Sequence, residues 1–165
     1  MRALGILAAA FGFGVASAMI PILNVEAYLA LNVAVLGKTL VVGLVFFLAV
    51  GTTIGKVVLF HGARAGREYA RKRVVDTSEL EPRRFAALRA RFTTMTAGLM
   101  RFLDHPVKGP LTVLLSAIVG IPPLLAVAVA AGASKQNVWL FAAAIFVGRA
   151  IRFAVIALTV AGLLG

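Results

Sequence analysis

Hydrophobic residues are grouped along the chain into four long blocks with few polar interruptions. The blocks run over residues 3–36, 39–60, 107–133 and 138–165. At 1.5 Å per residue, the second block forms a helix of about 33 Å, which is enough to cross a hydrocarbon core of about 30 Å. The fourth block is as long and contains no proline. The pattern therefore predicts membrane-spanning helices in the second and fourth blocks.

The first and third blocks are each interrupted by proline. Pro21 interrupts the first block, and Pro122 and Pro123 interrupt the third. Proline removes a backbone donor and breaks a helix. Broken backbone at membrane depth survives only where protein or water covers it. Either all four blocks cross the membrane, or the first and third fold back as re-entrant hairpins. The re-entrant topology places Lys135 in the cytoplasm and the C-terminus outside, and the four-span topology reverses both.

Charge is concentrated between the second and third blocks. Residues 61–110 hold eleven of the seventeen Lys and Arg residues and five of the six acids. By the positive-inside rule, this segment lies in the cytoplasm. Within it, Ser78 to Glu81 resembles a capping box, and apolar residues follow at spacings of three and four from Phe85 to Phe102. This pattern predicts an amphipathic helix that either lies on the anionic inner leaflet or packs under the membrane bundle.

The composition is typical of an integral membrane protein and excludes several other classes. Hydrophobic residues make up 61% of the chain, charged residues only 14%, and the mean hydropathy is +1.00. The net charge of +11 does not indicate nucleic-acid binding, because the basic residues cluster in one connecting segment without a recognition motif. The chain has no cysteine, no metal-ligand spacing and no histidine in an apolar block that could activate a serine. We therefore expect no enzyme activity, no metal and no other cofactor.

The two halves of the chain resemble each other. In each half, a proline-broken apolar segment precedes an unbroken span, and Gly51 in the first span matches Gly148 in the second. Transporter folds repeat such units, and their broken segments meet at a site near the membrane midplane. We predict a single membrane domain with a first repeat over residues 1–60, a basic cytoplasmic loop over residues 61–106 and a second repeat over residues 107–165.

Small residues and a lysine mark the spans and the segment before the fourth block. Gly51 and Gly55 form a small-xxx-small pair, which favours close helix contact. Gly132 ends the short apolar run after the prolines of the second half, and Gly148 leaves room beside the arginine that follows it. Lys56 lies near the end of the second block, where its long side chain can extend to the headgroups.

Three ionisable groups lie deep in the apolar blocks. They are Glu26, Arg149 and Arg152, and each costs about 2.5–3.5 kcal/mol on an insertion scale. Such groups must be paired or hydrated. Arg149 and Arg152 share one helix face, and Glu26 is the one acid in the apolar blocks that can pair with either. Asn24 can add a polar lining.

Two interpretations of these charges stay open. In the first, Glu26 and an arginine form a static ion pair that holds the two halves together. In the second, they line a hydrated cavity between the repeats. There, Glu26 accepts and releases protons, while an arginine binds an anionic headgroup or phosphate.

Four motifs in this order resemble the DedA / VTT-domain (SNARE-associated Golgi protein) superfamily. They are IPILNVEAYLAL, GTTIGKVVLFHGARAG, GIPPLLAVAVAAG and FVGRAIRF, and the resemblance covers about residues 15–157. It is closest to compact bacterial VTT-domain proteins. On this resemblance, Glu26 matches the acidic residue of the family's first hairpin, and Arg149 and Arg152 match the basic pair after the second. The chain departs from the family pattern at Asn24, where many relatives have a second proline or glycine, and we expect no extra C-terminal helix.

The resemblance implies a fold and a function. It implies re-entrant segments of opposed orientation, each followed by a span, in the bacterial inner membrane. It also implies a translocase for lipids or lipid-linked carriers, with or without proton coupling. The expected partners are membrane lipids, such as an anionic phospholipid or a polyprenyl phosphate. A small-molecule or drug exporter and a non-transporting membrane scaffold are the alternatives, and the sequence leaves open whether the chain forms a homo-oligomer.

Overall fold

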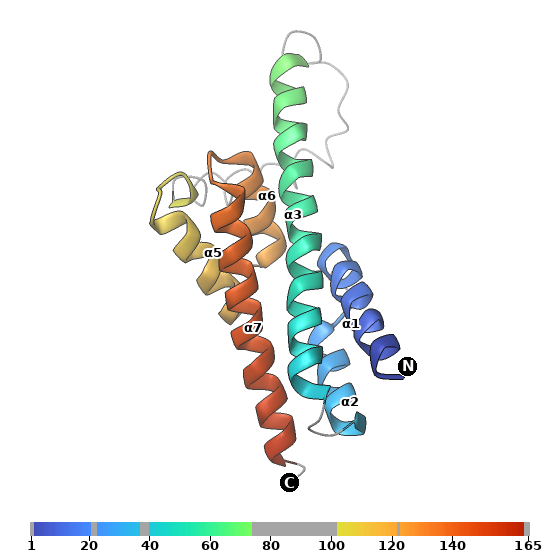
Figure 1. The fold of residues 1–165 in the computed structure, drawn as a ribbon. Helices are drawn as coiled ribbons and strands as arrows, with labels where there is room; N and C mark the ends of the chain where they lie inside the picture. The colour runs from blue at the N-terminus through green and yellow to red at the C-terminus, as the bar shows by residue number, and fades with distance from the viewer. Residues whose placement is uncertain (1, 21–22, 37–39, 74–101, 122, 164–165) are drawn as a thin grey trace, which may run out of the picture.

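The described part of the protein is helical throughout. The computed structural model describes residues 2–20, 23–36, 40–73, 102–121 and 123–163, and these ranges contain no strand. The all-α architecture expected from the sequence is confirmed for them. The helices of these ranges, labelled as in Figure 1, are α1 (Arg2–Met19), α2 (Val25–Leu36), α3 (Val41–Arg73), α5 (Lys108–Val119), α6 (Leu124–Ala133) and α7 (Val138–Leu163).

The first apolar block is broken into α1 and α2, as expected. Backbone N–H groups of Glu26 and Ala27 donate hydrogen bonds to the side-chain oxygen of Asn24 at 3.0 and 3.2 Å. Asn24 is therefore the N-cap of α2, because it satisfies donors that have no partner inside the helix. Pro21 lies outside the described residues.

The third block is broken into α5 and α6. Helix α5 ends at Gly120, whose φ of 89° is in the left-handed region that glycine reaches without strain. Helix α6 begins directly after Pro123, and no side chain caps its first turn. Pro122 lies outside the described residues, as do residues 78–101 of the expected amphipathic helix.

Helix α3 is longer than the apolar block that it contains. The apolar block ends at Phe60, but the helix continues to Arg73. Residues 61–73 are rich in Ala, Arg, Lys and Glu, which favour helix even in water. With 33 residues, α3 is about 50 Å long. The basic segment therefore begins as a continuation of the second apolar block.

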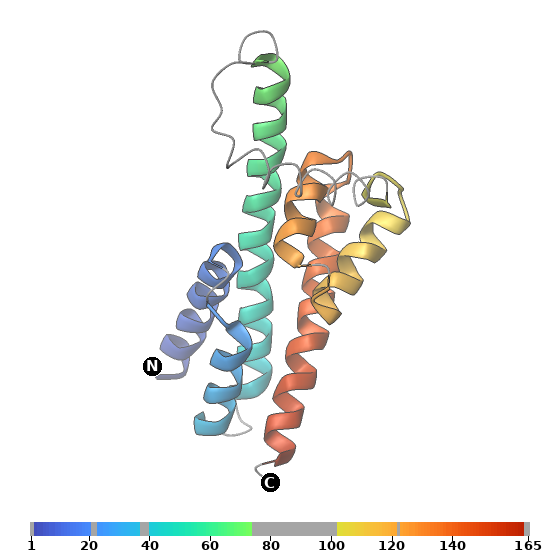
Figure 2. The same ribbon diagram turned by 180° about the vertical axis from the view of Figure 1, so that it is seen from behind.

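Helices α3 and α7 lie side by side and run in opposite directions (Figures 1 and 2). The α1–α2 hairpin lies toward one end of this pair and the α5–α6 hairpin toward the other, and both hairpins turn at middle height. Helix α1 packs on α3 and α2 on α7, whereas α5 packs on α7 and α6 on α3. Each hairpin therefore contacts both long helices.

One end of the bundle, which we call the basic end, carries Arg64, Arg67 and Lys135. Arg64 donates hydrogen bonds to the carbonyl oxygens of Ser134 and Gln136 at 3.4 and 2.8 Å, and Arg67 donates to the Ala133 carbonyl. The connection from α6 to α7 is thereby fixed beside α3. The C-terminal end of α7 lies at the opposite end of the bundle (Figure 1).

Two apolar clusters form the interior of the bundle. The cluster at the basic end includes Phe60 and Phe141, whose ring centroids are 4.7 Å apart. The other cluster includes Leu29, Leu48 and Phe153. Polar and charged residues of α3 and α7 lie between the two clusters along the chain. The bundle thus has a polar layer at the height at which both hairpins turn.

Close helix contacts occur at glycines of both spans and of the segment before the fourth block. A Cβ atom on Gly55 would lie 2.5 Å from Cβ of Ala18, and one on Gly51 would meet the Phe11 carbonyl, so both face α1. A Cβ atom on Gly148 would lie 2.6 Å from Cβ of Ala117 in α5. Gly132 faces the backbone of Phe60 in α3. The expected small-xxx-small contact is confirmed, and it joins α3 to α1.

Two helices are long and apolar enough to cross a membrane by length and composition. They are residues 41–69 of α3 and the whole of α7. The core helix of a soluble protein meets the same criterion.

Candidate functional site

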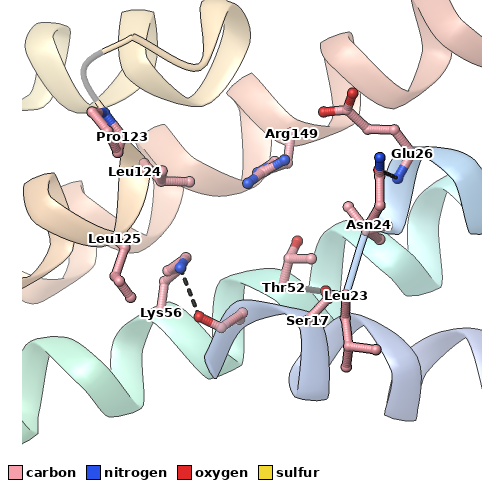
Figure 3. Close-up of a pocket in the computed structure, with 12 residues that line it drawn as sticks. Ser17, Leu23, Asn24, Glu26, Thr52, Lys56, Pro123, Leu124, Leu125 and Arg149 are labelled. Atoms are coloured by element: carbon pink, nitrogen blue, oxygen red, sulfur yellow. Dashed lines mark hydrogen bonds between the residues drawn. The ribbon is translucent and has the colours of Figure 1, made fainter. Parts of the chain in front are cut away.

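A cavity of about 450 Å³ lies in the polar layer, where the two hairpins turn. Its walls come from four places in the chain: the turn of the first hairpin, the start of α6, the middle of α3 and the middle of α7. Figure 3 shows Asn24, Lys56, Pro123 and Arg149 around it. Both hairpins and both long helices therefore contribute to one site.

Glu26 pairs with Arg152 at the edge of this cavity. The Arg152 Nη2 atom lies 2.6 Å from Oε1 of Glu26, and the two side chains are 24% and 35% exposed. The Nη1 atom of Arg152 donates to the Ile118 carbonyl at 3.0 Å. One guanidinium thus joins α7 to α2 and α5. The sequence predicted a partner for Glu26 among two arginines, and the structure identifies Arg152.

Arg149 lines the cavity and does not form an ion pair with Glu26 in the described part of the chain. Its Nε atom is buried without a hydrogen-bond partner among the described residues. Its guanidinium carbon lies 5.6 Å from the centroid of the Phe153 ring, within cation–π range. In Figure 3 the guanidinium extends into the space beside Leu124 and Lys56. Arg149 is therefore a cation with donors available to a ligand.

The Lys56 side chain is buried, which contradicts the expectation drawn from its position near the end of the second block. It does not extend to the headgroups, because it is only 5% exposed. Its ammonium group donates to the Ala18 carbonyl at 2.7 Å (Figure 3). Ala18 belongs to the last turn of α1, whose carbonyls have no partner within the helix. Helix α3 continues beyond the apolar block, so Lys56 lies in the middle of the bundle rather than at its edge.

Lys56 of α3 and Arg152 of α7 make equivalent contacts with the two hairpins. Lys56 binds a carbonyl in the last turn of α1, and Arg152 binds one in the last turn of α5. A positive charge at a helix C-terminus is favourable. Sequence reasoning missed Lys56 as a site residue, although its position relative to Gly51 resembles that of Arg152 relative to Gly148.

The N-termini of α2 and α6 also line the cavity. The first turn of α2 contains Glu26 and is capped by Asn24, so its partial positive charge is already compensated. The first turn of α6, at Leu124 and Leu125, has no side-chain cap. Its free N–H groups and the guanidinium of Arg149 lie on the same cavity. Such a combination attracts anions.

Gly120 leaves room for the guanidinium of Arg152. A Cβ atom built on Gly120 would lie 2.7 Å from Nη1 of Arg152. Any other L-residue would therefore displace the guanidinium from the Ile118 carbonyl, besides straining the backbone. The glycine before the two prolines is thus part of the site, a role that its sequence position alone does not reveal.

Within the described ranges, no group of three or more His, Cys, Asp or Glu residues could hold a metal ion. Comparisons of the chain with protein-family models, with curated proteins and with solved structures found no match. The site therefore has to be interpreted from its own geometry.

Proposed function

We propose that the chain spans a bacterial inner membrane with α3 and α7, and that the two hairpins are re-entrant. Helices α2 and α5 have 12 residues each and α6 has 10, which gives about 15–18 Å, half of a hydrocarbon core. Large apolar side chains are exposed along the bundle, for example Val42 at 81% and Leu158 at 70%. Such exposure is typical of surfaces that contact lipid or another protein.

The arrangement of the ends supports the re-entrant topology. Lys135 lies at the basic end beside residues 61–73, and the C-terminal end of α7 lies opposite. By the positive-inside rule the basic end faces the cytoplasm. The antiparallel long helices, each contacted by both hairpins, support two repeats of inverted orientation. These features also agree with the resemblance to the DedA / VTT-domain superfamily, which stays a proposal.

The proposed function is translocation of a lipid or lipid-linked carrier that has an anionic headgroup. The observation that carries it is the excess of positive charge at the central cavity. Glu26 is compensated by Arg152, whereas Lys56 and Arg149 have no carboxylate partner among the described residues. In a site of low dielectric, uncompensated cations strongly favour an anion. A phosphate group can accept hydrogen bonds from Arg149 and from the first turn of α6.

The ion pair between Glu26 and Arg152 gives the site a means of changing shape. It joins the first hairpin to α7, so breaking it leaves α2 held to the second half by apolar packing. An anion that attracts Arg152, or a proton on Glu26, would break it. Movement of the hairpins about the cavity would then open the site to one leaflet or the other, as in transporters built from inverted repeats.

Leaflet exchange in proteoliposomes tests the proposed function. The protein is expected to accelerate exchange of a labelled anionic phospholipid or of a labelled polyprenyl phosphate. Arg149→Gln removes a charge-assisted hydrogen bond of about 1.5–3 kcal/mol, so the rate falls roughly 10- to 100-fold. Lys108→Gln, which also removes one positive charge but at an exposed position of α5, is the control. Exchange no faster than in empty liposomes for all lipids would reject the proposal.

The two alternative functions, an exporter and a scaffold, require different properties of the same residues. An exporter of cationic compounds would need an uncompensated acid, but Glu26 is paired and the cavity is cationic. A scaffold would keep its cellular function when Arg149 is replaced by methionine. The charge distribution thus favours a translocase of anions over an exporter of cations, and Arg149→Met separates the translocase from a scaffold.

A further inference from the structure

A second, smaller cavity lies at the basic end, away from the central site. Its volume is about 200 Å³. The residues just before α5 form one wall, with Asp104 and His105, and the connection from α6 to α7 forms the other, with Lys135 and Gln136. The Lys135 backbone N–H donates to Oδ1 of Asp104 at 3.0 Å, which joins the two walls.

Gln136 is the buried polar group of this cavity. Its side chain is 6% exposed, and neither Nε2 nor Oε1 has a hydrogen-bond partner in the part of the chain that the structure describes. Its backbone is fixed, because its N–H donates to Oγ of Ser134 at 3.2 Å and its carbonyl accepts from Arg64. Buried amides nearly always have partners. The donor and acceptor of Gln136 are therefore available to a polar group in the adjoining space.

The wall of this cavity carries charges of both signs. Asp104 and Lys135 are both exposed, and no carboxylate among the described residues lies within ion-pair distance of the Lys135 ammonium group. Nδ1 of His105 accepts from the backbone N–H groups of Val107 and Lys108 at 3.3 and 3.4 Å, which assigns its proton to Nε2. The cavity thus offers an ammonium group, a carboxylate and an imidazole N–H. This set suits a zwitterion, unlike the cationic central cavity.

The neighbours of the cavity place it at the height of lipid headgroups. Trp139, in the first turn of α7, is 80% exposed, and tryptophan is enriched at membrane–water interfaces. Leu140, which lines the cavity, is 50% exposed. A lipid bound here would have its acyl chains beside Leu140 and its headgroup between Asp104 and Lys135. A soluble zwitterion would gain nothing from this apolar side of the cavity.

We propose that this cavity binds the headgroup of a zwitterionic phospholipid with a primary ammonium group, that is, phosphoethanolamine. The ammonium group donates to Asp104, the phosphate accepts from Lys135, and the amide of Gln136 hydrogen-bonds the headgroup. Phosphatidylcholine binds less well, because its quaternary ammonium has no N–H to donate. The inference rests on the proposed membrane location but not on transport, so it holds for a chain that moves no lipid.

Thermal unfolding of the delipidated full-length protein in detergent tests this site. Phosphatidylethanolamine and phosphatidylcholine, which have the same net charge, are added separately at the same mole fraction. Phosphatidylethanolamine is expected to raise Tm by several degrees more than phosphatidylcholine, and soluble phosphoethanolamine is expected to raise it less. Equal shifts for the two lipids would overturn the proposal. A larger shift with soluble phosphoethanolamine would do the same, because it would identify a free zwitterion as the ligand.

Variants test whether the preference for phosphatidylethanolamine arises at this cavity. Asp104→Asn and Gln136→Leu are expected to reduce the shift from phosphatidylethanolamine to that from phosphatidylcholine, whereas Lys108→Gln leaves the preference intact. Asp104 is exposed, so its variant keeps the test valid if Gln136→Leu does not fold. Lipid retained through purification, measured by native mass spectrometry, must show the same preference. A preference that survives Asp104→Asn would exclude this cavity as its source.

Discussion

The guanidinium of Arg152 lies 2.6 Å from the carboxylate of Glu26, so α7 is tied to the first hairpin at the height of the cavity. The two residues come from opposite halves of the chain. Because Arg152 also binds the Ile118 carbonyl, this one side chain contacts both hairpins. Its removal should therefore affect more than the ion pair.

A double-mutant cycle measures the coupling between Glu26 and Arg152. Glu26→Gln and Arg152→Gln each leave a half-buried partner unpaired, so each is expected to lower the free energy of unfolding. The double variant is expected to lose less than the sum, with a coupling of about 0.5–3 kcal/mol. Chemical unfolding in detergent, followed by circular dichroism, provides the values. Additive losses would mean that the pair contributes nothing to stability.

Lys56→Met is expected to destabilise the protein, because it leaves the Ala18 carbonyl buried without its donor. The cost of an unsatisfied buried group is about 1–3 kcal/mol. Lys135→Met replaces an exposed lysine and is expected to change the unfolding free energy by less than about 0.5 kcal/mol. Unfolding in detergent compares the two variants. Equal effects would contradict the buried position of Lys56.

Gly120→Ala is expected to destabilise the protein for two reasons that can be separated. The left-handed backbone costs an alanine about 1 kcal/mol, and the new Cβ atom also displaces Arg152. In an Arg152→Met background only the backbone cost and any residual contact remain, so the loss of stability should be smaller. If the loss is the same in both backgrounds, the contact with Arg152 is unimportant.

Gly55→Ala is expected to weaken the contact between α3 and α1, because the new Cβ atom would lie 2.5 Å from Cβ of Ala18. Overpacking of this kind costs about 1–3 kcal/mol. Gly62→Ala, in the same helix but with nothing within 4 Å, should instead stabilise it by up to about 1 kcal/mol. Gly55→Ala is expected to have the lower Tm of the two variants. The opposite order would contradict the close contact between α3 and α1.

Cysteine labelling tests the proposed topology without background, because the chain has no cysteine. A membrane-impermeant reagent applied to intact cells is expected to label Gly162→Cys and to leave Lys135→Cys unlabelled. Lysis should then expose Lys135→Cys to the reagent. Labelling of Lys135→Cys from outside would rule out the re-entrant topology.

The apolar pattern predicted more of the fold than of the site. Long apolar runs and the prolines located the helices and both breaks, because helix length and missing backbone donors act locally. The partner of Glu26 required three-dimensional information, since two arginines on one helix face were equally good candidates. Lys56 was misjudged because its depth was inferred from the end of the apolar block at Phe60, whereas α3 continues to Arg73. Gly120 acts through a contact with a residue 32 positions away, which no local pattern records.

Each hairpin contacts the long helix of the other half, and this has a consequence for synthesis of the protein. The side of α3 around Phe60 is covered by Gly132 of α6 and by Phe141 of α7, which follow more than 70 residues later. At about 5–20 residues per second, translation needs roughly 4–14 s to reach α6. During that interval the newly made first half exposes a surface that its own residues do not cover. If the chain inserts into a membrane as proposed, lipid or the insertion machinery contacts that surface until α6 arrives.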